Sequence, residues 1–219
     1  MIRAVLFDLD GTLYDRDASI LQMVDEQFEA FREELRHVDR SRFIERFLAL
    51  DAHGHSTTRG VYGLLGSGLG LDPALTARLE RYFSANYYRH CHLPPDTRRT
   101  LDVLRARGKK LGMITNGPIE WQSGKIDAMG LAESFDTILI SEAEGIQKPD
   151  ARIFARGVAR CGAVASESMF VGDHPNADIA GAEAAGLLPV WKRTRYWTVP
   201  EHVRSIGELS EILPWCLGE

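Results

Sequence analysis

The chain opens on a short apolar segment that ends in two carboxylates. Residues 4 to 13 read Ala-Val-Leu-Phe-Asp-Leu-Asp-Gly-Thr-Leu, so Asp8 and Asp10 stand two positions apart at the end of an apolar run. The run predicts a buried strand, and side chains two residues apart on a strand point to the same side. Two carboxylates at a buried edge are costly unless a cation or hydrogen bonds compensate them. The segment predicts a cation-dependent site, although Asp-Gly-Thr is also an ordinary turn sequence.

Further apolar runs follow in the second half of the chain. They lie at residues 110–114, 137–140, 169–171 and 187–191, and helix-length segments that end at a glycine lie between them. Glycine just past the last turn is a usual helix stop. Strands that alternate with helices are typical of a parallel sheet covered on both faces. Together with a first strand at residues 3–7, these runs predict a doubly wound α/β core.

Roughly 100 residues separate the first predicted strand from the second. Within this gap, apolar residues recur at the three- and four-residue spacing of helices. The predicted helices span residues 17–37, 41–52 and 74–90. The glycine-rich stretch 60–70, which includes Gly66-Ser-Gly-Leu-Gly70, is expected to be a flexible loop between them. We therefore expect a catalytic core of residues 1–15 and 94–219, with an inserted helical cap of residues 16–93.

Composition narrows the classes of protein to which the chain can belong. Its 219 residues are 44% hydrophobic, enough for one domain with a substantial core and an insertion. The net charge is -5 with both signs interspersed, so neither a nucleic-acid polymer nor a membrane is an expected partner. No apolar run approaches the roughly 20 residues of a membrane span. The three cysteines, Cys91, Cys161 and Cys216, are far apart, which favours reduced thiols and a cytoplasmic location.

Polar residues follow the predicted strands at the edge where open parallel sheets bind their ligands. Thr115 and Asn116 follow the second strand, Lys148 comes after the third, and Asp173 comes after the fourth, with Asp178 five residues later. Each has an ordinary interpretation as part of a turn, as a solvated residue at a helix start, or as a helix-start carboxylate. Their joint placement at one sheet edge favours a functional site.

Taken in order, these motifs resemble those of the haloacid dehalogenase superfamily, in the type with a helical cap inserted after the first motif. The resemblance runs nearly end to end and rests on Asp8-Leu-Asp10-Gly-Thr, Thr115-Asn116-Gly, Lys148-Pro, and Gly172-Asp173 with Asp178. It implies a Rossmann-like core and a magnesium-dependent phosphatase that forms an aspartyl-phosphate. Its substrate would be a small phosphorylated metabolite, namely a nucleoside monophosphate or a sugar phosphate.

The resemblance also implies a role for each residue. Asp8 would be the nucleophile, and Asp10 the general acid and then the base, with its main-chain carbonyl on the metal. Asp8, Asp10 and Asp173 would hold Mg²⁺, and Asp178 would support the metal shell or Lys148. Thr115, Asn116 and Lys148 would bind the phosphate, with Thr115 and Lys148 counted among the catalytic residues. Because a phosphate dianion repels an anionic nucleophile, such a site needs cations, and hard oxygen ligands suit Mg²⁺.

Three alternatives remain at this point. Haloacid dehalogenases typically lack an acid at the position of Asp10, since a departing halide needs no proton, so Asp10 favours phosphoryl chemistry over dehalogenation. A phosphomutase resembling β-phosphoglucomutase keeps the same acid pair and is not distinguished by the core motifs. A non-catalytic phosphate-binding regulatory protein would be expected to lack Asp8 or Lys148, and both are present.

Overall fold

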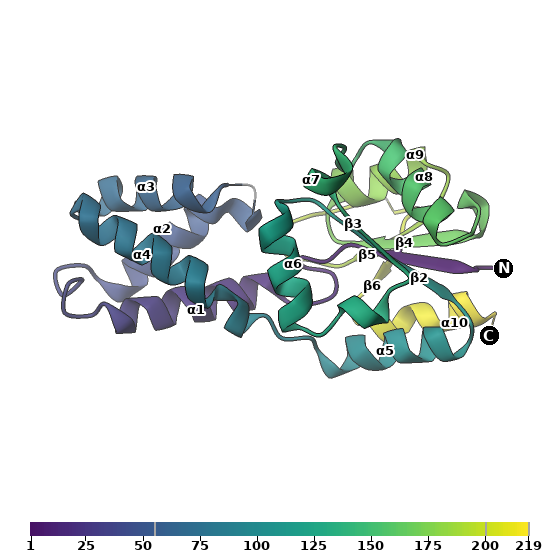
Figure 1. The fold of residues 1–219 in the computed structure, drawn as a ribbon, viewed down its shortest axis with the longest axis horizontal. Helices are drawn as coiled ribbons and strands as arrows, with labels where there is room; N and C mark the ends of the chain where they lie inside the picture. The colour runs from purple at the N-terminus through teal and green to yellow at the C-terminus, as the bar shows by residue number, and fades with distance from the viewer. Residues whose placement is uncertain (55, 200, 219) are drawn as a thin grey trace. The chain divides into compact units, whose positions relative to one another are not determined.

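The computed structural model describes residues 1–54, 56–199 and 201–218, and the chain divides into two compact units. The first unit combines Met1–Asp15 with His92–Glu219, and the second is Arg16–Cys91. A parallel sheet lies in the first unit, whereas helices make up the second (Figure 1). Each unit has its own hydrophobic core.

The first unit contains a six-stranded sheet in which all strand pairs are parallel, in the order β3-β2-β1-β4-β5-β6. The strands are β1 (Ala4–Phe7), β2 (Lys110–Thr115), β3 (Thr137–Ile140), β4 (Ser168–Gly172), β5 (Leu188–Lys192) and β6 (Arg204–Ile206). This arrangement confirms the predicted α/β class. The edge strand β6 was not predicted, because three residues of mixed polarity carry too little pattern.

Helices cover both faces of this sheet. The helices of this unit are α5 (Pro95–Ala106), α6 (Ile119–Ala128), α7 (Ser141–Glu144), α8 (Ala151–Arg160), α9 (Gly181–Ala184) and α10 (Leu213–Leu217). Short helical turns are η3 (Ala132–Ser134), η4 (Ala165–Glu167), η5 (Pro175–Ala180) and η6 (Leu209–Ile212). In Figure 1, α8 and α9 lie over one face, and α5 and α10 lie over the other. On the α8 face, the rings of Phe154 and Phe170 pack edge to face with centroids 4.9 Å apart.

The register of the sheet brings the ends of three strands to one edge. Phe7 of β1 pairs with Met113 of β2 on one side and with Val171 of β4 on the other. The Asp8 N–H donates to the Val171 carbonyl oxygen at 2.9 Å, which extends the ladder past the end of β1. Residues at or just beyond the carboxyl ends of these strands therefore share the edge where open parallel sheets bind ligands.

The second unit is a helical module inserted between β1 and β2. Its elements are α1 (Arg16–Ala30), α2 (Arg40–Asp51), η1 (Ala52–Gly54), α3 (Thr58–Leu69), α4 (Pro73–Asn86) and η2 (Tyr87–His90). Phe47, Tyr62 and Phe83 form an aromatic cluster with ring centroids 5.5 to 5.9 Å apart. Buried Gln27 accepts a hydrogen bond from the Tyr62 hydroxyl at 2.8 Å. Within the described ranges, no helix of either unit is long and apolar enough to cross a bilayer.

Residues 60–70 do not form the flexible loop expected from their glycines, because most of them belong to α3. The side-chain oxygen of Thr57 accepts from the Gly60 N–H at 3.2 Å and caps the helix start. Val61, Tyr62 and Leu65 are buried, so packing outweighs the low helix propensity of glycine.

Two other helices of this module differ in extent from the prediction. The helix expected over residues 17–37 ends at Ala30, and hydrogen-bonded turns continue the chain to residue 37. The helix expected over 74–90 ends at Asn86 and tightens into the 3₁₀ turn η2. Both differences lie at C-terminal ends, where helices commonly tighten into turns.

Candidate active site

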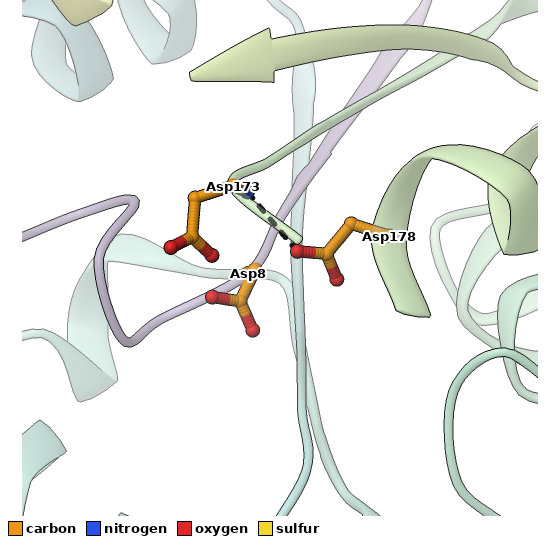
Figure 2. Close-up of side chains that lie close together, drawn as sticks. All are labelled: Asp8, Asp173 and Asp178. Carbon is orange, nitrogen blue, oxygen red and sulfur yellow. Dashed lines mark hydrogen bonds between the residues drawn. The ribbon is translucent and has the colours of Figure 1, made fainter. Parts of the chain in front are cut away.

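Three aspartates meet at the carboxyl edge of the sheet. Asp8 directly follows β1, Asp173 directly follows β4, and Asp178 lies on η5 (Figure 2). One carboxylate oxygen from each lies within 4.8 Å of the others. Asp8 and Asp178 are buried and Asp173 is partly buried. A cluster of hard oxygen ligands at this spacing could hold a divalent cation.

Both oxygens of Asp178 are engaged by protein groups. Its Oδ2 accepts from the main-chain N–H groups of Asp173 and His174 at 3.0 and 2.9 Å. Its Oδ1 accepts from Lys148 Nζ at 2.7 Å. Asp178 therefore joins the loop after β4 to Lys148, and this geometry fits a supporting residue better than a direct metal ligand.

Lys148 is a buried cation placed against two of the aspartates. Its side-chain Nζ lies 2.5 Å from Asp8 Oδ1 and 2.7 Å from Asp178 Oδ1, and the residue is 3% exposed. It precedes a cis peptide bond to Pro149. Hydrogen bonds between buried groups of opposite charge, such as those from Lys148 to Asp8 and Asp178, are short and strong.

The side chain of Asn116 holds the main chain of Lys148. The Lys148 N–H donates to Asn116 Oδ1 at 2.9 Å, and Asn116 Nδ2 donates to the Lys148 carbonyl at 3.0 Å. The sequence predicted that Asn116 binds phosphate, whereas its side-chain amide is used here to position the lysine. A phosphate contact from Asn116 would therefore come from its main-chain N–H.

The aspartates outnumber the cationic side chains in this cluster. Burial raises the pKa of Asp8 to about 7, and Asp178 adds to this shift against the opposing charge of Lys148. Burial also raises the pKa of Asp173 to about 9, with contributions from Asp8 and Asp178. Burial disfavours the charged form of Lys148, but the carboxylates of Asp178 and Asp8 outweigh it and raise the pKa of the lysine. One lysine therefore does not neutralise the cluster.

The carboxylate of Asp173 shows where a cation would fit. Within the described residues, its two oxygens have no hydrogen-bond or ion-pair partner, although the group is partly buried. Among the described residues, Oδ2 of the neighbouring Asp8 carboxylate accepts only one long hydrogen bond, from the Thr12 hydroxyl at 3.3 Å. These oxygens fit the preference of Mg²⁺ for a few carboxylate ligands completed by water.

Two glycines allow the carboxylates to approach so closely. Gly11 has φ of +82°, and a Cβ atom there would overlap with Asp173 Oδ2. A Cβ atom on Gly172 would overlap with Cβ of Asp178. Glycine is therefore required at both positions by close approach, and at Gly11 also by the backbone conformation.

Asp10 lies in a second, separate cluster of polar groups. Lys125 Nζ lies 2.7 and 2.8 Å from the two oxygens of Asp10. The Tyr14 hydroxyl donates to Oδ1 at 2.6 Å, and Gln122 Nε2 donates to Oδ2 at 2.9 Å. Gln122 Nε2 also contacts the hydroxyl oxygen of Thr115. The expected acid and the expected phosphate-binding threonine are thus joined through one glutamine.

The sequence reasoning missed Tyr14, Gln122 and Lys125. A signal existed for two of them, because Gln122 and Lys125 are three residues apart on the helix that follows Thr115. Such spacing places both side chains on one helix face. Both are buried, which is unusual for lysine without a partner.

We expect Mg²⁺ to raise the melting temperature of the protein. This increase should become larger as the pH rises through about 7, the pKa of Asp8, toward about 9, the pKa of Asp173. Raised pKa values mean that the folded, metal-free protein favours protonated carboxyls, so its stability falls as pH rises. Bound metal displaces those protons, so its affinity rises with pH. Thermal melts with Mg²⁺ or chelator across this range test the prediction. The variant Asp173→Asn should lose the effect, and a pH-independent increase would contradict it.

Comparison of the chain with models of known protein families identifies its family. The family model for haloacid dehalogenase-like hydrolases matches residues 2–186. The chain belongs to this hydrolase family. The resemblance inferred from the motifs is confirmed, and the helical module between β1 and β2 is the family's inserted cap.

Several proteins similar to this chain are named as phosphatases. The glyceraldehyde 3-phosphate phosphatase of Methanothermobacter thermautotrophicus is 32% identical over 203 residues, covering 87% of this chain and 85% of the relative. The ribulose-1,5-bisphosphate 5-phosphatase of Halopiger xanaduensis is 32% identical over 215 residues, covering 87% and 84%. The crystal structure of a phosphatase of this family from Thermococcus onnurineus aligns with a TM-score of 0.67 and 27% identity, covering 99% and 98% of the two chains.

Proposed function

We propose that this chain is a Mg²⁺-dependent phosphatase that hydrolyses small phosphate monoesters through an aspartyl-phosphate on Asp8. The observation that carries the proposal is the buried Asp8 carboxylate, with Lys148 Nζ 2.5 Å from one oxygen and Asp173 beside it. A carboxylate attacks a phosphate dianion only where cations offset the repulsion. The chain's place in the hydrolase family and its phosphatase relatives support the same reaction.

In this proposal, the phosphate lies at the carboxyl edge of the sheet. Lys148 and the Thr115 hydroxyl bind its oxygens, together with the main-chain N–H of Asn116. Asp8, Asp173 and the main-chain carbonyl of Asp10 would hold Mg²⁺, and Asp178 keeps Lys148 and the loop after β4 in place. When bound, Mg²⁺ would neutralise charge on the phosphate oxygens.

The reaction then takes two displacements at phosphorus. A carboxylate oxygen of Asp8 forms a bond to phosphorus, the bond to the leaving oxygen breaks, and Asp10 donates a proton to that oxygen. Asp10 next accepts a proton from water as the water oxygen attacks phosphorus. The bond to Asp8 breaks, which releases inorganic phosphate and restores the carboxylate. The proton taken from water leaves Asp10 protonated for the next cycle.

The proposed substrates are sugar phosphates and nucleoside monophosphates. Two relatives covered over most of their length are named for glyceraldehyde 3-phosphate and ribulose 1,5-bisphosphate, which favours small phosphorylated sugars. Both compounds carry a phosphate on a primary alkyl oxygen, a poor leaving group that needs protonation. This requirement agrees with an acid at Asp10.

Phosphate release from a panel of such compounds tests the function. The panel should include triose, pentose and hexose phosphates, nucleoside monophosphates and p-nitrophenyl phosphate, each with Mg²⁺ and with chelator. We expect metal-dependent release of inorganic phosphate, fastest on a sugar phosphate. Conversion of a sugar phosphate into its isomer without free phosphate would instead establish a mutase, and no turnover of any compound would reject both enzymes.

We expect Asp10→Asn to slow the enzyme according to the leaving group. Without a proton donor, kcat/KM on alkyl phosphates should fall by about 10² to 10⁴-fold, but by much less on p-nitrophenyl phosphate, whose phenolate leaves unaided. Steady-state kinetics on both substrate types measure the difference. Equal losses would show that Asp10 does not act as the acid.

A further inference from the structure

Lys125 is a buried lysine outside the metal cluster that the proposed reaction does not use. It lies on α6, is 6% exposed, and contacts the Asp10 carboxylate through Nζ at 2.7 and 2.8 Å. Removing an ammonium group from water is unfavourable unless strong partners compensate it. The burial of Lys125 beside Asp10 therefore indicates a role beyond core packing.

We propose that Lys125 is a positioning residue for the general acid: with Gln122, it fixes the Asp10 carboxylate beside the phosphate-binding hydroxyl of Thr115. The inference rests on the proposed phosphatase activity and assigns a role to two residues that the proposed mechanism lacks. Neither residue is placed on the substrate or the metal. Both act through Asp10 and Thr115.

The hydrogen bonds fix the carboxylate in a defined plane. Lys125 spans both oxygens of Asp10, while Tyr14 holds Oδ1 and Gln122 holds Oδ2. Rotation of the carboxylate would break several of these contacts together. An acid-base group held in this way stays in register with the leaving oxygen and with the attacking water, and misplacement by about 1 Å can cost about 10²-fold in rate.

Lys125 also sets the orientation of Gln122. The Gln122 Oε1 accepts from Lys125 Nζ at 2.8 Å, so the amide nitrogen is turned toward Asp10 and Thr115. One turn of α6 thereby links the end of β1 to the end of β2. The acid and the phosphate-binding hydroxyl are kept at a constant separation by side chains from a single helix.

A structural ion pair and a positioning residue predict different kinetics. If Lys125 only stabilises the fold, its loss lowers the melting temperature and affects all substrates alike. If it positions Asp10, its loss should affect the leaving groups that need a proton, and it should have no further effect once Asp10 is replaced. A double-mutant cycle separates these cases.

The experiment compares wild type, Lys125→Met, Asp10→Asn and the double variant on a sugar phosphate and on p-nitrophenyl phosphate, with Mg²⁺. We expect Lys125→Met to lower kcat by about 10 to 10²-fold on the sugar phosphate, with a smaller loss on the aryl ester and KM changed by less than about threefold. In the Asp10→Asn background, it should change kcat by less than about twofold. Lys110→Met, which removes an exposed lysine paired with Asp136, is the matched control and should resemble wild type.

Two further variants keep the test decisive if thermal melting shows that Lys125→Met folds poorly. Gln122→Met leaves the lysine in place and should show the same dependence on leaving group, and Lys125→Arg should recover part of the activity. Equal losses on both substrates, or full additivity with Asp10→Asn, would overturn the positioning role and leave the phosphatase standing. A wild-type protein that releases no phosphate would overturn the proposed function and this inference with it.

Discussion

Asp8→Asn is expected to abolish turnover, lowering kcat by about 10³-fold or more. The carboxamide is not a nucleophile toward phosphorus, so no phosphoenzyme forms. Its oxygen can still accept the hydrogen bond that Lys148 Nζ donates to Asp8 Oδ1 at 2.5 Å. Lys148 keeps its ion pair with Asp178, and burial already disfavours the charged form of Asp8, so the melting temperature should not fall. Phosphate release and thermal melts together measure both expectations.

Trapping the phosphoenzyme makes this test specific. Acid quenching with ³²P-labelled substrate should leave label on the wild-type chain and none on Asp8→Asn, with the label mapped to the peptide that contains residue 8. Asp102→Asn, on the exposed face of α5, is the matched control and should retain wild-type rates. A rate for Asp8→Asn within about tenfold of wild type would reject Asp8 as the nucleophile.

Lys148→Met is expected to cost both activity and stability. The lysine is the ion-pair partner of Asp8 and of Asp178, at 2.5 and 2.7 Å, so its removal leaves two buried carboxylates facing each other. Breaking a buried ion pair in this way typically lowers the free energy of unfolding by about 3 to 5 kcal/mol. The substrate phosphate also loses its fixed cation, so kcat/KM should fall by about 10³-fold.

The stability cost of Lys148→Met should depend on pH. The charge of Lys148 lowers the pKa of Asp8, which is about 7 when the lysine is present. Without it, the carboxyl keeps its proton to higher pH, and protonation relieves the repulsion. Urea unfolding should therefore show a larger loss in alkaline than in acidic buffer. Lys110→Met serves as the control with little expected effect, and an unchanged midpoint for Lys148→Met would contradict the buried network.

Local sequence patterns were enough to predict most of the core fold. The apolar run at β1 and the glycines that end the helices act within a few residues, so neighbours along the chain determine them. The rule that ligands bind at the carboxyl ends of parallel strands then predicts that Asp8, Thr115 and Asp173 share one edge of the sheet.

The pattern failed where packing opposes local preference. The glycines of residues 60–70 indicated a loop, but α3 forms there because it buries Val61, Tyr62 and Leu65 against neighbouring helices. A close approach explains Gly66 in particular, since a Cβ atom there would overlap with Thr76 of α4. Composition alone does not reveal which glycines lie at helix contacts.

The sequence by itself determined the acidic and basic residues of the site and the strand ends that carry them. Only the tertiary structure decided how they are paired: Asp10 with Lys125, Asn116 with the main chain of Lys148, and Asp178 with two neighbouring N–H groups. The first pair is 115 residues apart and the second 32, so no local period links their members. Such contacts depend on the register of the sheet and the placement of α6, which emerge when the whole core packs.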